Sequence, residues 1–317
     1  MRIVFLGTPA FAASVLEHIV HTTKHEVVLV VSKPDAPVGR GQHLVATPVK
    51  EMAQRLLPQV EVFQPQKASD PKSVAYIRQF HPDVGVVVAY GEILKPPFLE
   101  IPRFGSYNIH ASLLPAYRGA APIQRSLMDG CSRSGVTIFR INIALDSGDI
   151  VWQEGCSVGP DTTAGELTKD LLELAKRGIV ESLERIEAGS VTFHHQPPEE
   201  AISAPKIVPE DLILDPTQDI LRIHDRIRAL SPTPGAYFFV QYREQTKRLK
   251  VFRSHIDPSY TLEPTRWSVT PQGFLGLATP EGTLVLDVVQ LEGRSSMASD
   301  QFLRGVPLEQ LQFLVRP

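Results

Sequence analysis

The chain has 317 residues, of which 43% are apolar and 21% are charged, a balance that excludes a disordered or collagen-like chain. Its net charge of -3 excludes a basic field over the whole surface, so a nucleic acid would have to bind to a local patch. The two cysteines, Cys131 and Cys156, form no CxxC pair, and we predict neither a disulfide framework nor a metal site. No apolar run approaches the ~20 residues of a membrane span. We therefore expect a cytoplasmic protein without a membrane segment, long enough for two domains.

Strands and helices alternate through the first half of the chain. Residues 83–89 contain the run Val-Gly-Val-Val-Val-Ala, which has no polar face and is typical of a central parallel strand covered on both sides. Thr47-Pro48 and Asp70-Pro71 are each an N-cap residue followed by proline, a pattern that opens helices. The other predicted strands are 2–6, 27–31, 60–63 and 106–110, and the predicted helices are 9–20, 47–57, 71–80 and 120–129. This order predicts an α/β domain with a doubly wound, mostly parallel, Rossmann-like sheet.

The character of the sequence changes after about residue 188. Before that point, 135–141 and 149–157 are predicted to pair as antiparallel strands, and Thr163 with Glu166 forms a capping box that opens a long helix. The proline-rich stretch from Gln196 to Pro205 indicates an exposed linker. We predict a first domain at 1–189, a linker at 190–205 and a second domain at 206–317.

The second domain is predicted to be a smaller β-barrel, OB-like in type. Asp215-Pro216 predicts the start of a helix that ends near residue 229. The short β-type runs that follow are 236–242, 249–255, 267–270, 274–278 and 283–289. Several short strands at such spacing, separated by turns, favour a small barrel.

One basic segment stands out from an otherwise acidic chain. Residues 221–255 contain eight Lys and Arg side chains against two acidic ones. Such a segment is suited to gripping a polyanion, although a solvated helix face and strand edge would have the same composition. The candidates for this grip are Arg222, Arg226, Lys247, Arg248 and Lys250.

Two polar side chains follow each other at the end of a predicted strand. Asn108 and His110 are two residues apart, so both point to the same face of the strand. Ligands of open α/β sheets bind beyond such strand ends, where a carboxamide can donate to an oxyanion and an imidazole can exchange a proton. Asp146 and Asp149 are two candidates for an orienting acid. The alternative is a buried histidine with a structural role, and the pair alone does not decide.

A nicotinamide cofactor is disfavoured by the first loop. Gly7-Thr-Pro-Ala-Phe has one glycine where a dinucleotide fingerprint has three, and Pro9 removes a main-chain donor that a pyrophosphate would use. The function therefore has to come from residues further along the chain.

Longer strings around the Asn108–His110 pair resemble a known enzyme family. The strings Asn108-x-His-x-Ser-Leu-Leu-Pro, Arg118-Gly-x-x-Pro and Leu145-Asp-x-Gly are similar to those of the formyltetrahydrofolate-dependent formyltransferases. Further strings, such as Pro34-Asp-x-Pro-x-Gly-Arg-Gly and Val87-Val-Ala-Tyr-Gly, resemble the branch of that family whose members formylate methionyl-tRNA. The resemblance extends from Met1 to about Ala188 and continues more weakly into the second domain.

The resemblance implies a reaction and assigns roles to residues. The donor would be 10-formyltetrahydrofolate, the acceptor the amino group of methionyl-initiator tRNA, and no metal would be needed. Asn108 would hydrogen-bond the formyl oxygen, His110 would bind it or relay the proton, and Asp146 would orient His110 and accept the amine proton. The family also implies a monomer.

The resemblance further implies where the two substrates bind. Ser112, Leu113, Leu114 and Pro115 would line the folate site, for which apolar walls suit a flat pterin. Val88 and Tyr90 are candidates for the opposite wall, although ordinary core packing explains them equally well. The family places a contact with the tRNA acceptor stem in the loop 33–44, where Arg40 and Lys33 are the matching cations. The basic segment of the second domain would grip phosphates without recognising a sequence.

Other functions share the same core and stay open from the sequence. A formyltransferase for a small amine, such as an amino sugar or a purine precursor, and a hydrolase of the same folate would both use Asn108, His110 and Asp146. A binding protein that has kept the fold without catalysis is a third possibility. The Arg40 loop, the second domain and its basic segment favour the tRNA substrate, because a small acceptor needs none of them.

Overall fold

The computed structural model describes residues 1–38, 43–262 and 265–315, which form two compact units. The first unit comprises Met1–Pro122, Ser134–Cys156 and Asp170–Ala204, and the second comprises Ile123–Arg133, Ser157–Lys169 and Pro205–Pro317. The second unit thus includes two short segments that precede residue 170 in the chain. The boundaries at 189 and 206 therefore stay a prediction.

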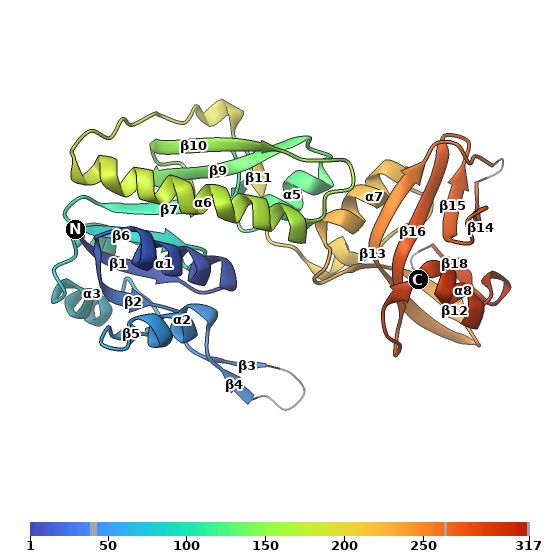
Figure 1. Cartoon of the computed structure of the whole chain (residues 1–317), viewed down its shortest axis with the longest axis horizontal. Coiled ribbons are helices and arrows are strands. Elements are labelled where there is room, and N and C mark those ends of the chain that lie inside the picture. Colours follow the sequence, from blue (N-terminus) through green and yellow to red (C-terminus); the bar gives the residue numbers. More distant parts are fainter. Residues whose placement is uncertain (39–42, 263–264, 316–317) are drawn as a thin grey trace. The chain divides into compact units, whose positions relative to one another are not determined.

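The first unit is built on a seven-stranded sheet (Figure 1). In spatial order its strands are β10 (Ile150–Ser157), β9 (Arg133–Arg140), β7 (Ser106–His110), β6 (Val84–Val88), β1 (Arg2–Gly7), β2 (Glu26–Val31) and β5 (Val62–Phe63). The pairs from β7 to β5 are parallel, and β7 pairs with β9 antiparallel. The predicted α/β domain with a doubly wound, mostly parallel sheet is confirmed.

Helices cover both faces of this sheet, because its central strands are apolar on both sides. Val4 and Leu6 of β1 pack in one cluster with residues of two helices, while Ile3 and Phe5 point to the other face and are equally buried. The helices of the first unit are α1 (Ala10–Thr22), α2 (Pro48–Leu56), α3 (Pro71–Arg78), α4 (Pro96–Leu99) and most of α6 (Ala164–Glu187), whereas α5 (Pro122–Met128) belongs, apart from Pro122, to the second unit. Figure 1 shows α1 and α6 lying along the sheet.

Three of the predicted helix starts are present with their capping bonds. The side chain of Thr47 accepts from the Lys50 amide, and the side chain of Asp70 accepts from the Ser73 amide. Thr163 and Glu166 form the expected reciprocal bonds ahead of α6. Each such cap satisfies main-chain donors that the first turn of a helix leaves unpaired.

Two small sheets complete the first unit. Strand β3 (Ala36–Val38) pairs with β4 (His43–Val45), and β8 (Arg118–Gly119) pairs with β11 (Ser203–Ala204). Strand β11 of the second pair lies within the predicted linker. The expectation of an exposed linker is therefore wrong for Gln196 and Ala204, whose exposed fractions are 2% and 0%.

The second unit contains a curled antiparallel sheet that forms a half-barrel, as predicted. Its strands are β14 (Arg266–Val269), β15 (Leu275–Thr279), β16 (Gly282–Leu291), β13 (Gln245–Asp257), β12 (Ala236–Tyr242) and β18 (Gln312–Leu314), with β17 (Met297–Ala298) paired to β16. Its helices α7 (Ile220–Ala229) and α8 (Ser299–Gly305) pack against strands of this sheet. Alternate residues of β12, among them Phe238 and Val240, point into an apolar core.

The predicted start of α7 is wrong. The helix begins at Ile220 with Asp219 as its N-cap, whereas the carboxylate of Asp215 accepts from the Thr217 amide in a local turn. Both aspartates have the right chemistry for a cap, and the sequence pattern selected the one that precedes proline. Among the described residues, no helix combines the length and the apolar character needed to traverse a lipid bilayer.

Candidate active site

The carboxyl ends of three adjacent strands meet at one edge of the sheet in the first unit. Gly7 at the end of β1 is level with Val88 at the end of β6, and Val88 is level with Ile109 in β7. His110 is the last residue of β7 and therefore lies at this edge. Loops that follow these strands converge here, which makes the edge the expected place for a ligand.

Asn108 and His110 share one face of β7, since their side chains alternate with those of Tyr107 and Ile109. His110 is 6% exposed, whereas Asn108 is partly exposed. The carboxamide of Asn108 makes no hydrogen bond to any other residue that the structure describes. Its two N–H donors are thus available to a ligand at the strand end.

The histidine ring is held in one orientation by its surroundings. Its Nε2 lies 2.8 Å from the carbonyl oxygen of Tyr117, and its ring packs edge-on against Phe139. A carbonyl only accepts, so Nε2 carries a hydrogen and donates it. In the neutral ring Nδ1 is then left without a proton, and it lies 3.8 Å from Oδ2 of Asp146. A proton taken up at Nδ1 would face that carboxylate.

The structure distinguishes the two candidate acids. Asp146 is the residue next to His110, and its Oδ2 also accepts from the main-chain amide of Gly119 at 2.9 Å. The carboxylate of Asp149 instead pairs with His195, whose side chain is 81% exposed. Asp146 is therefore the acid that the structure brings to the Asn108–His110 pair.

Glycine is required where the Asp146 turn meets the sheet. The turn leaves β9 with Asp146 at φ 47°, a left-handed conformation that aspartate tolerates better than most residues. A Cβ on Gly148 would collide with the carbonyl oxygen of Arg140, so the chain approaches the strand too closely for any side chain. This contact explains the glycine of the Leu-Asp-x-Gly string.

The loop 112–115 is fixed by hydrogen bonds to two strands. Thr137 Oγ1 donates to the carbonyl of Ser112 and accepts from the amide of Leu114, while Gln153 donates to the carbonyl of Leu114. The hydroxyl of Ser112 donates to Ala116 within the loop. The loop is thus rigid and partly apolar, which fits the predicted wall of a pterin site. That role stays a prediction.

Val88 and Tyr90 are placed in the core, with exposed fractions of 1% and 2%. Burial raises the pKa of the Tyr90 hydroxyl, so this group stays protonated, and it has no partner among the described residues. Lys33 lies over the Tyr90 ring at 4.9 Å and pairs with Glu92 at 2.9 Å. The residue predicted for the acceptor stem, Arg40, lies outside the described residues.

The basic candidates of the second unit differ in how far they are already occupied. Arg248 pairs with Glu292, Arg226 donates to the carbonyl of Ile213, and Lys250 donates to the carbonyl of Pro234. Arg222 is exposed and Lys247 is half-buried.

A further cation group lies around the buried ring of Tyr242, at the tip of the β12–β13 hairpin. Arg243, Lys247 and Arg294 lie over this ring at 5.2, 6.0 and 5.7 Å. We call these three residues the hairpin cluster. Only Lys247 was among the predicted contacts, because Arg294 is distant in sequence and reaches the hairpin through the fold.

Two profiles of known protein families match this chain. The profile described as formyl transferase matches residues 1–183, and the profile of the formyl transferase C-terminal domain matches residues 206–307. The chain belongs to the formyl transferase family.

Relatives within the family match the chain over nearly its whole length. A protein of Protochlamydia amoebophila named methionyl-tRNA formyltransferase is 39% identical over 99% of this chain and 98% of its own. A protein of the same name from Roseiflexus castenholzii is 40% identical over 97% of each chain. Both domains of the family are thus present here in the same order.

Solved structures show the same fold at much lower identity. An N-formyltransferase of Helicobacter canadensis, solved with folinic acid and dTDP-3-aminofucose, has a TM-score of 0.65 at 17% identity and covers 90% of this chain and 97% of its own. A glycinamide ribonucleotide transformylase of Symbiobacterium toebii has a TM-score of 0.51 at 20% identity, covering 62% of this chain and 94% of its own. At such identities the likeness concerns the fold alone.

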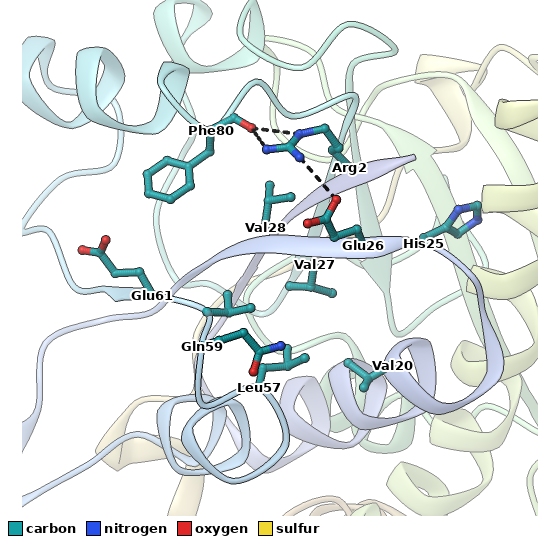
Figure 2. A pocket seen from close by; sticks show the side chains of 11 residues that line it. Arg2, Val20, His25, Glu26, Val27, Val28, Leu57, Gln59, Glu61 and Phe80 are labelled. Atoms are coloured by element: carbon teal, nitrogen blue, oxygen red, sulfur yellow. Dashed lines mark hydrogen bonds and ion pairs between the residues drawn. The ribbon is translucent and has the colours of Figure 1, made fainter.

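A separate cavity of about 500 Å³ opens at the other edge of the same sheet (Figure 2). Arg2 and Glu26, the first residues of β1 and β2, both line it and pair at 3.2 Å, and Arg2 also donates to the carbonyl of Phe80. Arg2 and Glu26 thus neutralise each other in its wall. Because it opens at the amino ends of the strands, it is distinct from the place where Asn108, His110 and Asp146 lie.

The sequence did not indicate which residues hold the Asp146 turn. Gln196, from the predicted linker, donates to this turn and accepts from Arg118, and Gly119 donates to the carboxylate itself. Arg118 and Gly119 belong to a string that carries the family resemblance, whereas nothing in the sequence distinguished Gln196. No group of three His, Cys, Asp or Glu side chains suited to a metal ion occurs within the described ranges.

Proposed function

We propose that the protein transfers the formyl group of 10-formyltetrahydrofolate to the free amino group of methionyl-initiator tRNA. The observation that carries this function is the meeting of Asn108, His110 and Asp146 at one sheet edge, in a chain that matches methionyl-tRNA formyltransferases from end to end. The product is N-formylmethionyl-tRNA, the form used to initiate translation.

The reaction at the formyl carbon develops negative charge and requires the transfer of one proton. The folate supplies an electrophilic formyl carbon. The methionyl amine forms a bond to that carbon, the bond from the carbon to the folate nitrogen breaks, and one amine proton leaves while that nitrogen gains one. The side chains therefore have to stabilise negative charge on the formyl oxygen and move one proton.

The three polar residues meet both needs. The free N–H donors of Asn108 are placed to stabilise charge on the formyl oxygen. The Asp146 carboxylate accepts the amine proton, directly or through water, and that proton then passes to the folate nitrogen as its bond to the carbon breaks. Since Nε2 of His110 donates to Tyr117, the ring meets Asp146 through Nδ1 in a fixed orientation.

The folate is assigned to the rigid loop 112–115. Leu113 and Pro115, both partly exposed, supply apolar walls beside the buried Leu114, and the bonds from Thr137 and Gln153 keep the loop in place before the ligand arrives. A preformed wall lowers the entropy lost on binding. Val88 and Tyr90 support this region from the core.

We assign tRNA binding to exposed cations of the second domain, 206–317, and catalysis to the first domain, 1–189. The hairpin cluster is favoured over Arg248, Arg226 and Lys250, because those three bond to a carboxylate or to main-chain carbonyls, whereas the cluster contacts the ring of Tyr242 and, from Arg294, its hydroxyl. Arg40 and Lys33 are assigned to the acceptor stem, where Lys33 would exchange its ion pair with Glu92 for a phosphate. We further propose that the protein acts as a monomer in the cytoplasm, where charged initiator tRNA is used.

Removing two charges from the hairpin cluster is expected to weaken tRNA binding without affecting the chemistry. In Arg243→Ala/Arg294→Ala, KM for methionyl-tRNA should rise, the slope of log KM against log salt should fall by about 2, and KM for the folate should stay unchanged. The matched control is Arg266→Ala/Arg304→Ala, which removes two exposed arginines from the same unit. An equal effect in both double variants would show that the loss of positive charge alone weakens tRNA binding and that the hairpin cluster has no special part in it.

One assay tests the function directly. Purified protein is given labelled 10-formyltetrahydrofolate with charged initiator tRNA, charged elongator tRNA, an amino sugar nucleotide, or no acceptor. We expect formylation of initiator methionyl-tRNA far above the other three reactions. Formylation of the sugar alone, or folate hydrolysis without transfer, would refute the proposal.

A further inference from the structure

Gln196 is a buried side chain outside the catalytic trio, and every polar atom of its amide is in use. Its Nε2 donates to the carbonyl of Asp146 at 3.0 Å and to the carbonyl of Gly148 at 2.7 Å. Its Oε1 accepts from Arg118 Nε at 3.1 Å and from Nη2 at 2.7 Å. Because an arginine only donates and carbonyls only accept, these partners fix which end of the amide is oxygen.

The turn that Gln196 holds is the one that carries the Asp146 carboxylate. Asp146 has φ 47°, a conformation that costs free energy in an unconstrained chain. The two bonds from Nε2 hold the main chain at residues 146 and 148, on both sides of Ser147. The direction in which the carboxylate leaves this turn therefore depends on Gln196.

The same segment supports Asp146 by a second route. Strand β11 pairs with β8, and Gly119 of β8 donates its amide to Oδ2 of Asp146 at 2.9 Å. A Cβ on Gly119 would lie 2.5 Å from the carbonyl oxygen of Ala204, so glycine is needed for this approach. The segment thus supports Asp146 by two routes, through the main chain of its turn from Gln196 and through β8 from β11.

We propose that Gln196 is a positioning residue for the reaction: it keeps the Asp146 carboxylate beside His110, and Arg118 keeps Gln196 in the required orientation. This inference rests on the proposed function for its kinetic consequence, although the contacts themselves do not depend on it. Gln196 acts through Asp146 and touches no reacting atom.

The variant Gln196→Glu separates the bonds that residue 196 accepts from Arg118 from the bonds that it donates to the turn at Asp146. A glutamate still accepts from Arg118, so the arginine keeps a buried partner, but it has no donor for the two carbonyls of the turn. We expect kcat to fall by about 10- to 100-fold through misplacement of the carboxylate, with both KM values near those of the wild type, and the melting temperature to fall because two buried carbonyls lose their donor. Gln196→Met, which loses both sets of bonds at similar volume, should be at least as slow.

A double variant tests whether the effect passes through Asp146. Gln196→Glu/Asp146→Asn should be no slower than Asp146→Asn alone, since a carboxylate that is absent cannot be misplaced. If the two losses multiply, Gln196 acts elsewhere and the inference is wrong. It is equally wrong if Gln196→Glu retains the kcat of the wild type.

A readout without substrate separates this inference from the proposed function. Hydrogen exchange at the Gly119 amide, which donates to Asp146, should be faster in Gln196→Glu than in the wild type, and unchanged in the matched control Gln54→Glu on the exposed side of α2. If the wild type fails to formylate methionyl-tRNA, but the Gly119 amide still exchanges faster in Gln196→Glu than in the wild type, the proposed function alone is refuted. Unchanged exchange at Gly119 refutes the positioning role.

Discussion

Replacing Asn108 with alanine is expected to lower kcat for formyl transfer by about 10²–10³-fold, the usual loss when one donor to a developing oxyanion is removed. The carboxamide is partly exposed and bonds to no other described residue, so its donors serve a ligand and not the fold. The melting temperature and folate binding should therefore change little. The measurements are single-turnover formylation rates, thermal unfolding and folate titration.

Asn108→Asp sharpens the same test because it keeps the shape of the side chain. The substitution replaces the N–H donors with a carboxylate oxygen that repels charge on the formyl oxygen. We expect this variant to be slower than Asn108→Ala, whereas a purely steric role for Asn108 predicts the opposite order. A rate for Asn108→Asp close to that of the wild type would remove Asn108 from the mechanism.

Much of the architecture could be predicted because it depends on local signals. Thr47 and Asp70 cap helices through bonds to residues three positions away, and the apolar run within 83–89 forms the buried strand β6. The pairing of Asn108 with His110 on one face follows from the two-residue period of a strand. Each of these inferences needs only a few neighbouring residues.

The remainder of the site depends on contacts between distant residues. Gln196 reaches the turn at Asp146 from fifty positions away, and a proline-rich sequence predicts exposure, not burial against a catalytic turn. The choice between Asp146 and Asp149 is similar, because both belong to one turn and only the position of His110 separates them. Spacing along the chain carries no information of this kind.

The Asp146→Asn variant is expected to lose about 10²–10⁴-fold in kcat, the range attributed to a positioned acid or base. Asparagine tolerates a left-handed φ as aspartate does, and its oxygen can still accept from the Gly119 amide, so the turn should keep its shape. The variant therefore removes the charge and leaves the geometry. Single-turnover rates with saturating folate and tRNA measure the loss, and thermal unfolding checks the fold.

The chain offers a matched control for this substitution three residues further along. Asp149→Asn makes the same chemical change in the same turn, but the carboxylate of Asp149 pairs with an exposed histidine and not with His110. Its kcat should stay near that of the wild type. If Asp149→Asn is the slow variant and Asp146→Asn is not, the 3.8 Å approach of Asp146 to His110 has no part in catalysis. Because the two variants differ only in which carboxylate is neutralised, a loss confined to Asp146→Asn ties the proton transfer to the acid that faces the imidazole.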